Sequence, residues 1–248
     1  LELLARLVDT SLVTVEVAPD GSVRYQLLDT LRRYAWDHLV AAGEVPQVRT
    51  RHLAWYLALT ERAARAGHGP DQASMLAQVA VEYANLAAAF AWAEEGRSAE
   101  AGLRLAVALG PVWHASGYTD EDRQRVEALL ALAEPATTGV DPLLRARGLC
   151  TAGMLALRRG DIERAGACYH DALALQRAAG DGTAAAQTLN HLGMLAYERG
   201  DFAAAEACHG EALVLQRACD DLHGVATSLG HLGIIAYNRR EYGRAEAL

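Results

Sequence analysis

Apolar residues in the second half of the chain recur at the spacing of amphipathic helices. Over residues 184–218 they fall at positions i, i+3, i+4 and i+7, which places them on one face of a helix. Gly200-Asp201 interrupts the pattern, with a glycine suited to ending one helix and an aspartate suited to capping the next. The two stripes are Leu189, Leu192, Gly193, Ala196 and Tyr197, and then Phe202, Ala205, Cys208, Ala212 and Leu215. The pattern predicts a hairpin of two helices.

This hairpin belongs to an internal repeat with a period of 40 residues. When residues 144–183 are laid over residues 184–223, 19 positions are identical, and a third copy from Gly224 matches the second at 11 of its 25 positions. Gly193 and Ala205 are small, so the paired helices can approach closely. A single hairpin cannot bury its apolar face alone, and the copies are therefore expected to stack into an α-solenoid.

Residues 1–45 show a different pattern. A helix over 1–8 is followed by β-rich runs at 11–18 and 23–27, with a turn at Pro19-Asp20-Gly21 between them. A second helix is predicted from Asp29 to Gly43, where the glycine suits the position after the last turn. Helix, hairpin and helix in this order are the back half of a winged-helix fold.

Residues 46–134 are predicted to be a helical bridge between the winged-helix segment and the repeats. Leu109-Gly110 and Gly117-Tyr118 keep the seven-residue glycine spacing of the repeats, so a degenerate copy is expected there. A linker from Pro135 ends at Asp141-Pro142, a cap and a first helical residue. The repeats then occupy 143–248, about two and a half copies, and the chain is expected to be part of a longer protein. The four bridge helices are predicted at 45–67, 71–95, 99–117 and 119–134.

The repeat resembles a known family. Leu189-x-x-Leu192-Gly193-x-x-Ala196-Tyr197, followed by Gly200-Asp201-Phe202-x-x-Ala205 and by Ala212, is similar to the tetratricopeptide repeat. The usual unit has 34 residues, so the 40-residue period implies a longer second helix and turn. The resemblance implies a mostly α fold whose first helices line a concave groove.

The first half resembles a segment of bacterial STAND-class regulators, the signal-transduction ATPases of the LuxR and antibiotic-regulatory kinds. In such proteins this winged helix follows a nucleotide-binding module. The resemblance implies that an ATPase module, with ATP or ADP, lies upstream of Leu1, and that no cofactor binds to this chain. It rests on Leu7–Val13, Tyr25–Ala35, Arg51–Leu57 and Glu82–Trp92.

Composition narrows the function further. All 23 basic residues are arginine, so the chain lacks the lysine that a P-loop or a pyridoxal enzyme requires, and we expect no enzyme activity. The net charge of −8 argues against nucleic-acid binding, and the first 52 residues carry six arginines against seven acids. The sequence has no apolar run of 18 residues, so we expect no membrane span and a cytoplasmic protein with reduced cysteines.

DNA contact and metal binding are two functional interpretations of single residues, and a structural explanation of the same residues is better supported in each case. Arg32-Arg33 begins the only recognition-type helix, yet its segment is net acidic, which disfavours direct DNA contact. Cys168 and His170 face apart on one helix, and small-residue packing explains this cysteine better than a metal does. His191 and His231 recur because the repeat is duplicated, and they are expected to be ordinary helix-surface residues.

The candidate site is the concave groove. Asn190 is the preferred single residue, because an amide can hold both an N–H and a C=O of an extended peptide. An ordinary solvated face remains the alternative. The groove positions are Arg147, Cys150, Met154, Arg158, Gln187, Asn190, Met194, Tyr197, Glu198, Thr227, Ile234, Tyr237 and Asn238.

The function expected from these features is that of an interaction and effector-sensing arm in a STAND-type transcriptional regulator. The groove would bind a protein segment, a peptide or a small effector, and self-association of the chain is a further expectation. The alternative is a stand-alone scaffold that assembles proteins without a nucleotide switch.

Overall fold

The computed structural model describes residues 2–17, 21, 23–65, 72–96, 98–133 and 139–248. The chain divides into two compact units, residues 1–52 and residues 53–248. Its described regular structure is almost entirely helical and contains a single two-stranded sheet. The mostly α class predicted from the sequence is therefore confirmed.

The first unit contains a helix, a hairpin and a helix, as the alternation pattern predicted. Helix α1 (Glu2–Asp9) precedes strands β1 (Val13–Val17) and β2 (Val23–Leu27), which pair antiparallel with Val15 opposite Tyr25. Helix α2 (Asp29–Ala41) follows, and Gly43 beyond it has a φ of +70°, which confirms the predicted glycine stop. Of the turn at 19–21, residues 19 and 20 lie outside the described residues.

Within its described residues, the bridge contains one more helix than the periodicity predicted. The single helix expected over 71–95 is wrong, because the chain leaves helical geometry at Glu82 and forms α4 (Gln72–Val81) and α5 (Tyr83–Glu95). The Glu82 carboxylate accepts hydrogen bonds from Tyr56 Oη at 3.1 Å and Asn85 Nδ2 at 2.6 Å. These side-chain contacts stabilise the break. The other bridge helices are α3 (Val45–Arg65), α6 (Ala99–Ser116) and α7 (Asp120–Leu132).

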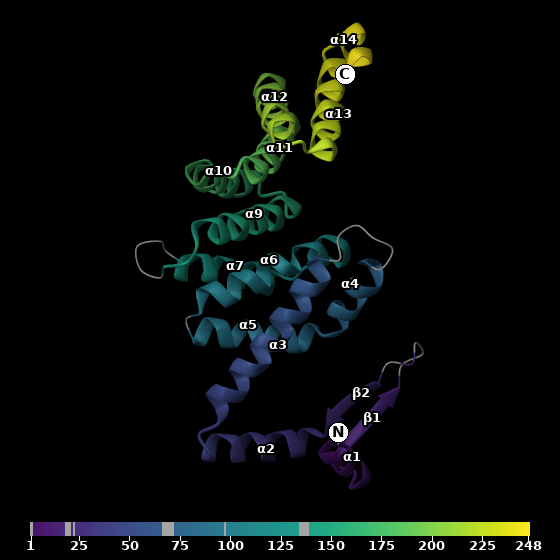
Figure 1. Ribbon diagram of the computed structural model, residues 1–248, viewed down its shortest axis with the longest axis vertical. Helices are drawn as coiled ribbons and strands as arrows, with labels where there is room; N and C mark the ends of the chain where they lie inside the picture. The colour runs from purple at the N-terminus through teal and green to yellow at the C-terminus, as the bar shows by residue number, and fades with distance from the viewer. Residues whose placement is uncertain (1, 18–20, 22, 66–71, 97, 134–138) are drawn as a thin grey trace. The chain divides into compact units, whose positions relative to one another are not determined.

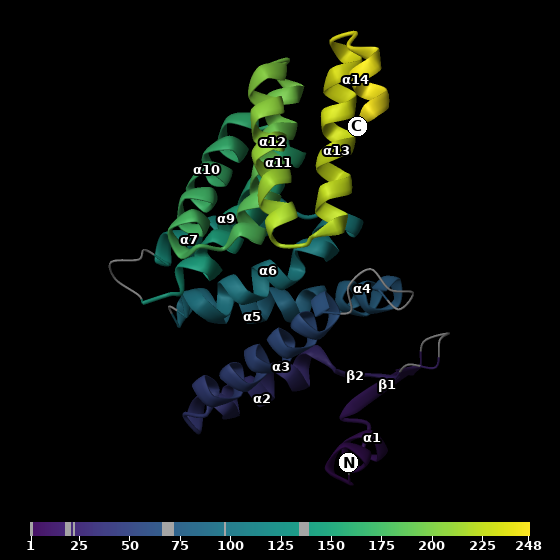
Figure 2. The same ribbon diagram turned by 45° about the horizontal axis from the view of Figure 1, so that its top comes forward.

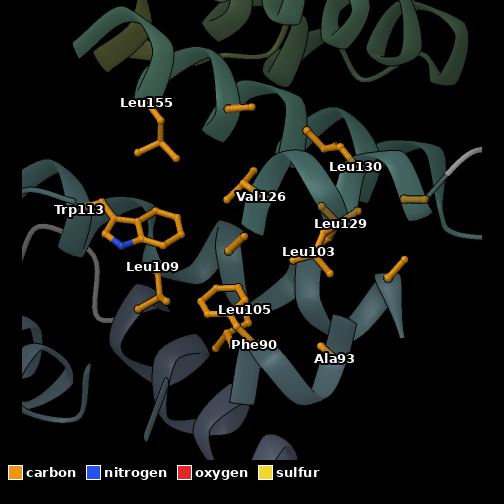
Figure 3. Packing of buried hydrophobic residues seen from close by; sticks show 14 of the residues in the cluster. Phe90, Ala93, Leu103, Leu105, Leu109, Trp113, Val126, Leu129, Leu130 and Leu155 are labelled. Carbon is orange, nitrogen blue, oxygen red and sulfur yellow. The ribbon is translucent and has the colours of Figure 1, made fainter. Parts of the chain in front are cut away.

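The bridge and the first repeat share one hydrophobic core (Figure 3). Phe90 on α5 and Trp113 on α6 stack with ring centroids 6.2 Å apart. Leu103 on α6, Leu129 on α7 and Leu155 on the first repeat helix are fully buried against them. Each such side chain contributes about 1.5–3 kcal/mol through burial, so this core fixes the first repeat on the bridge.

Six helices follow as three consecutive pairs (Figures 1 and 2). Each first helix begins at an aspartate cap, and Asp161 and Asp201 cap the second helices of the first two pairs. Gly160 and Gly200 end the preceding helices with φ values of +78° and +77°, which confirms the predicted glycine–aspartate junction. The helices are α9 (Pro142–Arg158), α10 (Ile162–Ala179), α11 (Gly182–Glu198), α12 (Phe202–Ala218), α13 (Leu222–Asn238) and α14 (Tyr242–Ala247).

Glycines allow the paired helices to touch. A Cβ added at Gly153 would lie 2.7 Å from the Tyr169 ring, and one at Gly193 would lie 2.6 Å from His209 Nε2. Tyr169 and His209 occupy the same position in successive repeats and are each 1% exposed. The close approach predicted from Gly193 is confirmed, and the ring that fills the space differs between the repeats.

Candidate binding surface

The first helices of the repeats, α9, α11 and α13, present rows of equivalent residues 40 positions apart. The central row is apolar: Met154 is half-buried, Met194 is 37% exposed and Ile234 is 50% exposed. Polar residues flank it at seven positions before and four positions after, on the same helix face. These flanking residues, all exposed, are Arg147, Gln187 and Thr227 on one side and Arg158, Glu198 and Asn238 on the other. We call the three rows together the inner face.

An apolar pocket opens on the inner face between α11 and α13, with a volume of about 240 Å³. Asn238 Nδ2 donates a hydrogen bond to Tyr197 Oη at 2.8 Å and so ties the two helices together beside it. The lining is mainly hydrocarbon and aromatic, and Glu198 carries its one carboxylate. The lining residues are Met194, Tyr197, Glu198, His209, His231, Ile234 and Ile235; we call this cavity the α11–α13 pocket.

A second, more polar cavity of about 460 Å³ lies between α9 and α11, where Arg147, Cys150 and Gln187 contribute to its lining. The structure thus places some of the predicted site residues in one cavity and some in the other, and the rest in neither. Met154, Thr227 and Asn238 belong to the inner face but line neither cavity. Arg158 donates a hydrogen bond from Nη1 to the His114 carbonyl at 3.0 Å, and the Tyr237 ring lies edge-on to Tyr242.

Asn190 is not positioned as the sequence suggested. It is 8% exposed, and its Oδ1 lies 2.8 Å from His209 Nδ1 and accepts a hydrogen bond from Ser228 Oγ at 3.0 Å. Ser228 Oγ in turn lies 2.7 Å from the side-chain amide of Gln216. This buried network joins α11, α12 and α13, which corrects the prediction that the Asn190 amide holds a peptide backbone.

The equivalent positions of the preceding repeat carry a smaller set of contacts. Cys150 occupies the position of Asn190, and its Sγ lies 3.4 Å from Thr188 Oγ1 and 3.7 Å from Gln176 Nε2. Burial raises the pKa of the Cys150 thiol, so the thiol is protonated at neutral pH and is a poor nucleophile. The cysteine therefore acts in packing.

Two histidines form the floor of the α11–α13 pocket. His209 and His231 stack with ring centroids 4.7 Å apart. Burial, together with the neighbouring His231, lowers the pKa of His209 to about 4, so its imidazole is neutral at pH 7. Because Asn190 Oδ1 accepts from it, Nδ1 carries the proton. His231 is half-buried here, whereas the sequence suggested an ordinary surface residue.

Sequence reasoning missed the part that His209 plays. The signal available was the substitution of His209 for Tyr169 at equivalent positions of two otherwise similar repeats. No group of three or more metal-ligating side chains lies close enough to hold a metal ion within the described residues.

The comparisons with known proteins agree with this architecture. Residues 144–218 match the model of the tetratricopeptide repeat family, in agreement with the resemblance seen in the repeat sequence. The structure of BtubC (BKLC) from P. vanneervenii superposes with a TM-score of 0.56 at 21% identity, covering 80% of this chain and 87% of that one. A provisionally named kinesin light chain of Podosopora anserina with nearly identical TPR-like repeats gives 0.52 at 15% identity, with 79% and 90% covered. Both show a tetratricopeptide-type solenoid.

Curated relatives are known from mycobacteria. The chain is 34% identical over 155 residues to provisionally named HTH-type transcriptional regulators of Mycobacterium tuberculosis (strain ATCC 25618 / H37Rv) and Mycobacterium bovis. The aligned region covers 62% of this chain and 17% of each relative. Tetratricopeptide solenoids typically serve as non-enzymatic surfaces for protein–protein interaction.

Among the described helices, none combines the length and the apolar character that crossing a membrane requires.

Proposed function

We propose that the chain is the protein-interaction arm of a transcriptional regulator and that its inner face binds a segment of a partner protein. The observation that carries the proposal is the apolar row of half-buried Met154 and exposed Met194 and Ile234, which crosses the first helices of three successive repeats between two polar rows. A row of this kind provides an apolar centre with a polar rim, as protein interfaces do.

The dimensions of the α11–α13 pocket favour a protein segment over a small effector. Its volume of about 240 Å³ lies below the roughly 300–1,000 Å³ of pockets that enclose drug-sized ligands. A single side chain of a longer segment suits this space, and the rest of the segment would cross the polar rows. The wider cavity beside Arg147 would receive its polar residues.

The test is a selection of displayed random 12-residue peptides on the whole chain, followed by binding measurements on variants. Arg147→Glu and Met194→Glu change two separate parts of the inner face. Val214→Glu is the matched control, because Val214 is 66% exposed on α12, a second helix of a repeat. We expect both inner-face variants to weaken the selected peptides about tenfold or more, while the control binds like the parent. Equal binding by all three variants would remove the inner face as the site.

We propose further that the chain works within a longer regulator of the STAND class. The support is the resemblance of the first half to that class and the regulator name of relatives of which the chain covers 17%. ATP or ADP would then bind to a module outside these residues. Sequencing the DNA upstream of the Leu1 codon tests this: a GxxxxGK[ST] motif is expected. Its absence would leave a scaffold without a nucleotide switch.

A further inference from the structure

The α11–α13 pocket can be compared with the equivalent position one repeat earlier, because the two interfaces share most of their sequence. At that earlier position Tyr169 stands where the pocket has His209, and its phenol ring stacks on His191 at 5.0 Å. Gly153 and Gly193 bring both rings against a first helix at nearly the same distance. An imidazole is smaller than a phenol ring, so the replacement of Tyr169 by His209 leaves space on the inner face.

The residues at the rim of the pocket also differ between the two repeats. Tyr197 replaces Leu157 and Glu198 replaces Arg158, so an aromatic ring and a carboxylate border the later pocket where the earlier interface has an aliphatic chain and a guanidinium. The walls above the histidine floor are Met194, Ile234 and Ile235, which bury aromatic rings well. The pocket therefore combines π-faces and a thioether with one negative charge.

We infer that this pocket receives one aromatic side chain of the partner segment and that Glu198 pairs with an arginine or lysine next to it. The inference rests on the proposed function, since it names the chemistry of the segment that the inner face binds. Glu198 is the one carboxylate among the lining residues, and the His209 imidazole is neutral and does not offset its charge. A basic neighbour is therefore favoured and an acidic one is repelled.

The repeats themselves supply the test variants. In Asn190→Cys/His209→Tyr both positions take the residues of the preceding interface, where Cys150 and Tyr169 are already accommodated. The larger tyrosine ring then fills the space that His209 leaves in the α11–α13 pocket. Glu198→Arg takes the residue of Arg158 and changes only an exposed rim position. Glu163→Gln, an exposed change on α10, is the control.

The probe is the displayed library of random 12-residue peptides, selected on the whole parent chain and on each variant, with affinities of synthetic peptides measured by fluorescence polarisation. From the parent we expect peptides with Phe, Tyr or Trp within two positions of Arg or Lys. Their Kd should rise about tenfold or more on the double variant, and on Glu198→Arg the preferred neighbours should change from basic to acidic. Glu163→Gln should leave Kd unchanged.

The outcomes separate the two proposals. Two results would overturn the pocket assignment and leave the inner face as the binding surface. In the first, the selected peptides depend on Arg147 or Met194 but lack an aromatic residue. In the second, they bind the double variant as tightly as the parent. A library that yields no binder would overturn both. Because Glu198→Arg changes only an exposed side chain, it decides the charge preference even if the double variant does not fold.

Discussion

The contact between Gly193 and His209 predicts a marked difference between two glycine-to-alanine substitutions. A Cβ at position 193 would lie 2.6 Å from His209 Nε2 and 2.7 Å from Cε1, about 1 Å inside normal contact distance. The imidazole cannot withdraw freely, because its Nδ1 lies 2.8 Å from Asn190 Oδ1 and the ring is 1% exposed. Overpacking of this kind costs about 1–3 kcal/mol, and displacing the histidine costs about 0.5–1.5 kcal/mol of hydrogen bonding.

Against these costs, alanine in a helix gains up to about 1 kcal/mol over glycine. We therefore expect Gly193→Ala to lower the free energy of unfolding by about 1–3 kcal/mol. Gly210→Ala, on the neighbouring helix α12, meets no atom within 4 Å and should raise it by about 0.5–1 kcal/mol. Thermal unfolding followed by circular dichroism measures the difference, which should be roughly 4–12 °C in Tm. If Gly193→Ala is as stable as Gly210→Ala, the close packing at His209 is refuted.

Three further predictions concern the repeats. Burial lowers the pKa of His209 from 6.5 to about 4, so the free energy of unfolding should be highest above pH 6.5 and should fall by up to about 3 kcal/mol as the pH approaches 4. Urea titrations across this range would show no such loss if the ring were already charged. Asn190→Ala leaves buried polar groups unpaired and should cost about 1–3 kcal/mol, while exposed Asn238→Ala should cost under about 1; equal losses would contradict the network. Arg240 has a φ of +63°, so Arg240→Gly should stabilise by about 1 kcal/mol and Arg239→Gly should not, as melting temperatures will show.

The repeat region was predictable because its determinants are local. The glycine–aspartate junction and the small residues at helix contacts lie within one hairpin, and the 40-residue period repeats that hairpin along the chain. The structure confirms each of these features. The break at Glu82 was not predictable, since no glycine or proline marks it and it is stabilised by Tyr56, which is 26 residues away. Periodicity alone continues through such a position.

The inner face was predictable as a surface but not in its details. Met194 and Glu198 follow from helix geometry, because they lie four residues apart on the exposed face of α11. The role of Asn190 could not be read from its spacing, because its partners Ser228 and His209 come from other helices. A polar residue on an inner helix can face the groove or the neighbouring repeat, and only the packing decides between them.

A partner segment that lies on the inner face can be located by photocrosslinking of a selected peptide. Benzoylphenylalanine would be placed at Thr227, which is exposed on the inner face and lines neither cavity, or at Val214, which is exposed on the second helix α12. We expect a crosslinked product from position 227 and none from position 214. Crosslinking from position 214 alone would show that the segment binds elsewhere.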